Sequence, residues 1–249
     1  MTEKEKNKIV DHWKAPNEGF FFIFMSKFVT FLTSIFVWFW MYVLNSTKFY
    51  EKKIISREKA PYVFASNHTT MFDSGFIDCI VFLKRGMFDY KFLPYHTPEY
   101  GNFYKNWFMS MYMNYVKCIP LERGKGIDQF AQKLVTKKLQ QGGIVHIFPE
   151  GTRSRSGDLL PGKAGVGKRI YESKVRAIPC YHEGIRDILP VGKSMPRIGK
   201  KVRVIIGEPI FFDEFFDMPN IPDTWKQISQ KIMDEINKLK GELHEREKR

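Results

Sequence analysis

The sequence has few cysteines, and several familiar signatures are missing from it. Cys79, Cys118 and Cys180 are its three cysteines in 249 residues, and they lie far apart in apolar settings. This pattern predicts buried, reduced thiols rather than a disulfide framework, as is usual in a reducing compartment. No repeat and no low-complexity tract is present, and no metal-ligand cluster is visible. We therefore expect one core of ordinary globular type and no metal site.

Signatures for a serine nucleophile and for nucleotide hydrolysis are missing as well. The sequence contains no G-x-S-x-G elbow. Residues 162–169, "GKAGVGKR", nearly spell a P-loop, but Arg169 stands where the magnesium-binding Ser or Thr belongs. We therefore do not expect an NTPase, and we predict instead that Gly165 and Gly167 allow close helix packing.

Basic side chains are concentrated in the middle of the chain. The net charge is +13, and residues 111–210 hold 19 basic against 8 acidic side chains, which is +11 of that total. Such a concentration attracts an anionic partner: a phosphate-bearing substrate, an acidic lipid surface or a nucleic acid. A nucleic acid is the poorest of these three, because the chain also carries a long apolar segment.

That segment is residues 20–44, which are apolar apart from Lys27 and a few hydroxyl residues. The uncharged part, 28–44, is at the short limit for crossing a hydrocarbon core of about 30 Å. A long polar lead and the lack of a small-residue cleavage site argue against a signal peptide. The aromatic residues near its end and the basic residues after it favour attachment to a membrane, with the following domain on the cytoplasmic side.

We therefore expect residues 1–47 to form a membrane-associated helical segment and residues 48–249 to form the main domain. The apolar helix could span the bilayer, or it could lie half-immersed beside an amphipathic helix at residues 3–15. A buried core helix is the alternative to both arrangements.

The periodicity of residues 48–249 alternates between strand and helix patterns. This alternation predicts an α/β fold with a mixed, mainly parallel sheet flanked by helices. The expected strands are residues 48–55, 62–66, 90–95, 116–121, 144–148, 176–182 and 201–210. The expected helices are residues 73–84, 99–114, 127–143, 164–173 and 223–247.

The stretch "NHTTMFD" places His68 and Asp73 five positions apart, between a buried strand and a helix. On a continuous helix their side chains would point about 140° apart, and on a strand they would lie about 16 Å apart. They can therefore touch only if the chain turns between them, as expected at a strand end. An Asp carboxylate that holds one imidazole nitrogen leaves the other as a proton acceptor. The alternative is a helix-capping Asp73 beside an unrelated His68.

A second group of polar residues follows the expected strand at residues 144–148, in "HIFPEGTRSRSG". Gly151 lets the backbone approach a ligand, Arg153 can hold phosphate oxygens with two parallel hydrogen bonds, and Thr152 adds a donor. Arg123, in "CIPLERGKG", follows another expected strand and could bring a second guanidinium to the same sheet edge. The alternative is an ordinary polar turn with solvated arginines.

The segments "NHTTMFD", "CIPLERG", "FPEGTRSRSG" and "AIPCY" together resemble the four ordered sequence blocks of the glycerolipid acyltransferase family, which includes the 1-acylglycerol-3-phosphate acyltransferases. The resemblance implies that His68 is the general base and that Asp73 orients it. It also implies that the glycerol-phosphate head is bound by Arg123, Glu150, Gly151, Thr152 and Arg153.

The implied reaction transfers an acyl chain from acyl-CoA or acyl carrier protein to the sn-2 hydroxyl of lysophosphatidate, giving phosphatidate, with no cofactor or metal. The stretches "VHIFPEG" and "GIRDILP" also resemble the tafazzin-type transacylases, which move acyl chains between phospholipids without CoA. The intact "GTRS" after Glu150 favours a phosphate monoester as acceptor. A membrane-binding module with a catalytically silent His–Asp pair is a further alternative.

Overall fold

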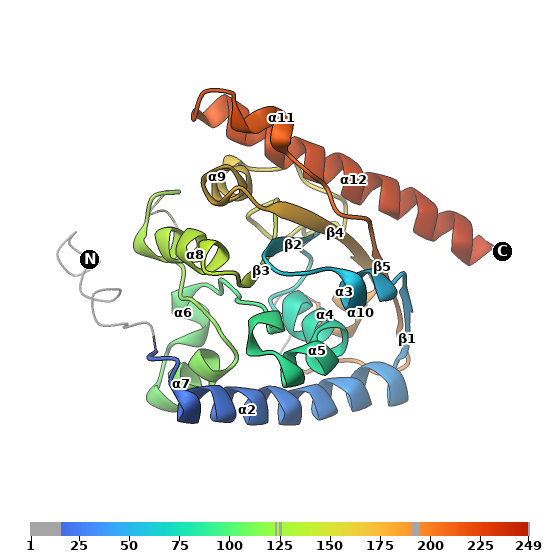
Figure 1. The fold of residues 1–249 in the computed structure, drawn as a ribbon. Helices are drawn as coiled ribbons and strands as arrows, with labels where there is room; N and C mark the ends of the chain where they lie inside the picture. The colour runs from blue at the N-terminus through green and yellow to red at the C-terminus, as the bar shows by residue number, and fades with distance from the viewer. Residues whose placement is uncertain (1–15, 123, 125, 191–194, 249) are drawn as a thin grey trace.

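A computed structural model describes residues 16–122, 124, 126–190 and 195–248 (Figure 1). The expected amphipathic helix at residues 3–15 and the side chain of Arg123 lie outside the described residues. The centre of the described chain is a five-stranded sheet in the order β1-β5-β4-β2-β3. Its strands are β1 (Ser46–Tyr50), β2 (Tyr62–Ser66), β3 (Ile144–Ile147), β4 (Arg176–Glu183) and β5 (Lys201–Ile206). Neighbouring strands are parallel except for β4 and β5, which confirms the mixed, mainly parallel sheet.

Strand β2 shows why this sheet has a core on each side. All five of its residues are buried, and successive side chains of a strand point to opposite faces. Val63 and Ala65 belong to one hydrophobic cluster, whereas Tyr62 and Phe64 belong to the other. The sheet is therefore the middle layer between two helical layers.

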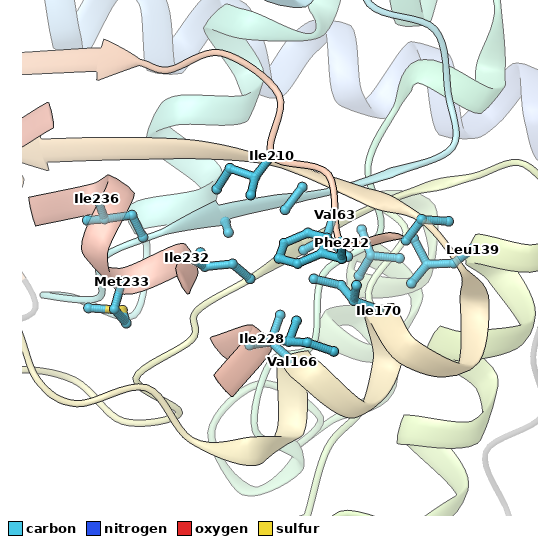
Figure 2. Packing of buried hydrophobic residues seen from close by; sticks show 14 of the residues in the cluster. Val63, Leu139, Val166, Ile170, Ile210, Phe212, Ile228, Ile232, Met233 and Ile236 are labelled. Carbon is cyan, nitrogen blue, oxygen red and sulfur yellow. The ribbon is translucent and has the colours of Figure 1, made fainter. Parts of the chain in front are cut away.

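The first helical layer consists of α8 (Phe130–Gln140), α9 (Ala164–Ser173) and α12 (Pro222–Lys248). Figure 2 shows Ile170 of α9 and Ile228 and Ile232 of α12 packed on the side of the sheet that carries Val63. A Cβ on Gly167 would lie 1.9 Å from the carbonyl oxygen of Trp225, so the α9–α12 contact requires glycine there, as predicted. The same prediction is wrong for Gly165, whose Cβ would meet no atom of the described chain within 4 Å.

The second layer consists of α3 (Lys53–Arg57), α4 (Asp73–Val81), α5 (Leu83–Phe88) and α10 (Ile185–Ile188). Outside it runs α2 (Phe20–Trp38), continued by the π-helical turn η1 (Phe39–Val43). Figure 1 shows α2 along one edge of the molecule, below α4, α5 and α7 (Trp107–Tyr115), and it contacts all three. The long apolar helix expected from the sequence is therefore confirmed.

Helix α2 packs through its small polar side. Ser26 and Ser34 are buried, Ser26 donates a hydrogen bond to the carbonyl of Tyr115, and Lys27 Nζ donates to the carbonyl of Met87 at 2.8 Å. The large apolar side chains are exposed instead, which rules out a buried core helix. They include Phe20, Phe21, Phe24, Phe28, Phe31, Leu32, Ile35, Phe36 and Trp38.

Several short apolar segments differ from their predictions. Residues 53–57 form α3 rather than the end of a strand, and residues 90–95 begin with the 3-10 turn η2 (Tyr90–Phe92). The expected strand at 116–121 is reduced to isolated bridges, with Cys118 opposite His96. The expected helix 99–114 is divided into α6 (Tyr100–Phe103) and α7, because Asn106 caps α7 by accepting from the amide of Met109. Runs this short can be buried as helix, turn or strand, so their periodicity does not decide between them.

The remaining helices and thiols agree with the predictions. Helices α4, α8, α9 and α12 overlap the expected ranges, and α12 matches its range to within a residue at each end. The short α11 (Asp213–Phe216) precedes α12. All three cysteines are free; Cys118 and Cys180 are buried as expected, whereas Cys79 is only partly buried.

Candidate active site

The chain turns between the end of β2 and the start of α4, and this turn brings His68 and Asp73 together. His68 Nδ1 lies 3.0 Å from Asp73 Oδ2. Asp73 is the first residue of α4, while the neighbouring cap position belongs to Phe72. The contact that the dyad interpretation requires is therefore present.

Asp73 is fully buried and accepts hydrogen bonds from the turn that it follows. Oδ2 accepts from the amides of Thr69 at 2.6 Å and Thr70 at 2.8 Å, and Oδ1 accepts from both threonine hydroxyls. Burial by itself raises the pKa of Asp73, but the nearby His182 and the hydrogen bond from His68 outweigh burial and lower this pKa to about 2. The carboxylate is therefore ionised at neutral pH and can orient the imidazole.

A second buried histidine lies behind Asp73. His182, on β4, places Nε2 2.9 Å from the carbonyl oxygen of Asn67 and 3.7 Å from Asp73 Oδ2. The Asn67 side chain also bonds both the amide and the carbonyl of His182, at 2.9 Å each. Sequence reasoning missed these two residues, although both lie at the carboxyl ends of neighbouring predicted strands, where sites of open α/β sheets are built.

The loop after β3 holds His68 from the other side. The backbone amide of His68 donates to Glu150 Oε1 at 2.9 Å, and its carbonyl accepts from the amide of Ser154 at 2.7 Å. The His68 ring stacks on Phe148, with ring centroids 3.8 Å apart and planes at 12°. The "NHTTMFD" and "FPEGTRS" segments therefore meet as one unit at the carboxyl ends of β2 and β3.

Glu150 differs from the expectation that it touches the substrate head. Its side chain is buried, and its second oxygen, Oε2, accepts from the amide of Leu160 at 3.3 Å. Burial raises the pKa of Glu150 to about 7. In the structure the Glu150 carboxyl therefore holds the backbone of His68 in place.

His68 opens onto a cavity of about 320 Å³. Gly151, Thr152, Arg153 and Lys163 line it together with His68. Gly151 has a φ of +58°, and a Cβ there would lie 3.1 Å from Lys163 Cδ, so the glycine leaves room for the lysine side chain to cross the loop. Two cationic side chains therefore share a cavity with the imidazole, and side chains of this type can hold an anionic group.

Other parts of the same cavity are largely apolar. Its lining includes Phe72 and Cys79 from the α4 region, Tyr112 and Met113 from α7, and Thr30 from α2. One cavity thus joins a cationic wall, a histidine and an apolar wall that reaches the long helix α2. This combination suits an amphiphile with a phosphate head and an acyl chain.

Three further residues in the cavity lining were not predicted from the sequence. They form a cluster of metal-ligand type, so the prediction that the chain has no such cluster is wrong. Asp78, His96 and His146 come from separate elements, and their ligand-type atoms lie within 4.8 Å of one another. His146 Nδ1 is 2.8 Å from Asp78 Oδ2, and His96 Nδ1 is 3.5 Å from the same oxygen. Burial lowers the pKa of His96 to about 4, so this ring is neutral at neutral pH.

Comparison with known proteins identifies the family. The model of the Acyltransferase family matches residues 46–183, more than half of the chain. The chain therefore belongs to the Acyltransferase family, and its resemblance to the glycerolipid acyltransferases is confirmed.

The similar proteins include tafazzins and 1-acyl-sn-glycerol-3-phosphate acyltransferases. The chain is 32% identical to a tafazzin of Drosophila melanogaster, over 92% of this chain and 65% of that protein, so it spans less than two thirds of that relative. It is 28% identical to a taffazin of Dictyostelium discoideum, over 83% of this chain and 78% of that protein. It is also 26% identical to a 1-acyl-sn-glycerol-3-phosphate acyltransferase of Bacillus subtilis, over 75% and 89% of the two chains.

A solved structure supports the fold. The crystal structure of the 1-acyl-sn-glycerophosphate acyltransferase PlsC from Thermotoga maritima superposes with a TM-score of 0.63 at 19% identity, covering 86% of this chain and 81% of that one. The glycerolipid acyltransferase fold expected from the sequence is therefore confirmed.

Proposed function

We propose that this protein transfers an acyl chain from acyl-CoA or acyl carrier protein to the sn-2 hydroxyl of lysophosphatidate, giving phosphatidate. The observation that carries this proposal is the shared cavity, in which His68, held by Asp73, lies with two cationic side chains and an apolar wall. The membership of the Acyltransferase family supports the acyl-transfer part of this proposal.

The His–Asp pair supplies the chemistry. Because Nδ1 donates to Asp73, Nε2 is free to accept the proton of the substrate hydroxyl while its oxygen attacks the thioester carbonyl. The tetrahedral adduct then collapses, the C–S bond breaks, and the thiolate takes the proton from the imidazolium. A cysteine-like thiol has a pKa of about 8.5, so this leaving group needs little help from an acid.

The cationic wall supplies the binding of the head group. Arg153 can hold two phosphate oxygens with its planar fork, and Lys163 adds a point charge across Gly151. Thr152 adds a hydroxyl donor on the same loop. Glu150 contributes indirectly, because it fixes the backbone of His68.

Residues 1–47 provide the membrane attachment in this proposal, and residues 48–249 form the acyltransferase domain. Helix α2 packs lengthwise on α4, α5 and α7. This packing supports an arrangement in which the helix lies in the plane of the interface rather than across the bilayer. Its exposed aromatic side then enters the apolar region, together with Trp107 and Phe108 of α7. The cavity reaches Thr30 on α2, so an acyl chain can enter from the bilayer while the head group stays at the cationic wall.

The same orientation accounts for the partners. The basic surplus of residues 111–210 attracts an acidic leaflet, at about 1 kcal/mol for each basic residue near the surface. The basic residues that follow α2 favour the cytoplasmic leaflet, whose anionic lipids attract them, so we propose that the domain is on the cytoplasmic side. Lipids and acyl thioesters, rather than nucleic acids, are the expected partners.

A CoA-independent transacylase of tafazzin type is the second candidate. The 32% identity with the Drosophila tafazzin extends over 92% of this chain, which favours it. The two reactions share the base and differ in the acyl donor, which is a thioester in one and a phospholipid in the other.

A donor panel separates these functions. Purified protein in vesicles is given lysophosphatidate with labelled acyl-CoA, labelled acyl carrier protein, or labelled phospholipid without CoA. The variant His68→Ala tests the base, and His244→Ala, exposed on α12, is the matched control. We expect thioester-dependent phosphatidate that is lost only in His68→Ala. Transfer from phospholipid alone would establish the transacylase, and equal turnover by His68→Ala and wild type would exclude the base.

A further inference from the structure

The geometry points to a binding site for one divalent transition-metal ion, of which Zn²⁺ is the best match, formed by Asp78, His96 and His146 in the cavity wall. Asp78 comes from α4, His146 from β3, and His96 from the segment between η2 and α6. The site is separate from the His68–Asp73 pair, and it does not depend on the acyl-transfer reaction proposed above.

The ligand types match this class of ion. Two imidazole nitrogens and one carboxylate suit zinc and its first-row neighbours, whereas magnesium and calcium prefer oxygen ligands throughout. Asp78 is 5% exposed, and a buried carboxylate needs a compensating positive charge or strong hydrogen bonds. All three residues line the cavity, so water or a substrate oxygen can take the fourth position of the ion.

The distances leave room for an ion between His96 and Asp78. Two ligand atoms about 2.0–2.1 Å from a tetrahedral zinc lie roughly 3.3–3.4 Å apart. His96 Nδ1 and Asp78 Oδ2 are 3.5 Å apart, and this buried nitrogen has no hydrogen-bond partner in the described part of the chain. The 2.8 Å contact between His146 Nδ1 and Asp78 is shorter, so it must open by about half an ångström when the ion replaces a proton.

A partner that fixes the metal-binding tautomer of His146 is already in place. Metal binding removes the proton from Nδ1, so the ring must carry its remaining hydrogen on Nε2. Nε2 lies 2.8 Å from Ser66 Oγ, and this hydroxyl lies 3.2 Å from the carbonyl oxygen of Asn67. Ser66 can therefore accept from Nε2 and donate to Asn67, which is the outer-shell arrangement that orients ligating histidines. The displaced proton goes to solvent.

The test is direct metal binding to the full-length protein in detergent after treatment with a chelator. Zn²⁺ is titrated by calorimetry, and Co²⁺ is titrated by its visible absorption, which reports the ligand geometry. His96→Gln is the main variant, because the replaced Nδ1 makes no hydrogen bond within the described residues. His244→Gln is the matched control, and His68→Ala tests the other histidine site. Circular dichroism checks that each variant is folded.

We expect one Zn²⁺ per chain, with affinity unchanged in His244→Gln and His68→Ala and weakened at least about tenfold in His96→Gln. Mg²⁺ in excess should not compete. Three results would overturn the site: no Zn²⁺ binding at micromolar concentrations by folded wild-type protein, equal affinity in His96→Gln, or loss of binding in His68→Ala alone.

Discussion

Replacing Asp73 with asparagine tests the buried carboxylate most sharply, because the change removes one charge and almost no volume. Three N–H donors converge on Oδ2, from Thr69, Thr70 and the His68 ring. The asparagine oxygen can take that position, while its amide faces the two threonine hydroxyls, which can rotate to accept. The turn should therefore keep its conformation in Asp73→Asn. The difference in the free energy of unfolding between wild type and this variant then measures the effect of the negative charge.

The magnitude follows from the pKa. The pKa of Asp73 is lowered to about 2 in the folded protein, against about 3.9 for an unperturbed aspartate, which corresponds to about 2–3 kcal/mol at neutral pH. Because the folded pKa is the lower one, this stabilisation is present above about pH 4 and is lost as the pH falls through about 2. Asp73→Asn should therefore lower the free energy of unfolding by about 2–3 kcal/mol from pH 7 down to pH 4, and by progressively less below.

The assay is guanidinium unfolding in detergent micelles, followed by tryptophan fluorescence at several pH values between 2 and 7. Turnover is measured in parallel: His68→Ala should lose about 10²- to 10⁴-fold. Asp73→Asn should lose less, about 5- to 30-fold, because a neutral hydrogen bond to the imidazole replaces a charge-assisted one. Wild-type stability in Asp73→Asn at pH 7, or a loss that does not change with pH, would refute this reasoning.

Three further perturbations address the head group, the bracing carboxyl and the membrane face. Arg153→Ala should raise the KM for lysophosphatidate by about 10- to 150-fold, because it removes a charged hydrogen bond worth about 1.5–3 kcal/mol. Arg155→Ala is the control, since Arg155 is exposed. Equal KM values in the two variants would remove Arg153 from the phosphate site. The pKa of Glu150 is raised to about 7 in the folded protein, so its contribution to the free energy of unfolding is present at acid pH and is lost as the pH rises through 7. The melting temperature of Glu150→Gln should therefore lie further below that of the wild type at pH 5 than at pH 8. A difference in melting temperature that does not depend on pH would contradict this role of Glu150. Replacing both Phe31 and Phe36, which are exposed on α2, with serine should weaken vesicle binding in flotation assays by at least tenfold. Each Phe that becomes buried in the bilayer contributes about 1.5–3 kcal/mol. Unchanged flotation would place α2 away from the bilayer.

The main strands and the long helices could be predicted from the amino-acid sequence alone. Residues 62–65 and 177–181 are continuous runs without a charged or amide side chain, and such runs are typical of strands that are buried on both faces of a parallel sheet. The segments at 53–57, 90–95 and 116–121 each combine apolar residues with at least one basic side chain, so their strand pattern is weaker. Their conformation depends on the elements that pack against them. In the structure Tyr95 forms an isolated bridge with Val145 of β3, and Cys118 forms one with His96. Tertiary packing therefore determines the secondary structure of these three segments.

The same division holds for the site. His68 and Asp73 could be paired from the sequence because a single turn joins them, and the loop at Gly151–Arg153 could be placed beside them because parallel strands end at one edge. The sequence could not show that Glu150 faces inward, that His182 lies behind Asp73, or that Asp78, His96 and His146 converge. Those contacts join segments far apart in the chain, so no local spacing encodes them, and they exist only once the sheet has assembled.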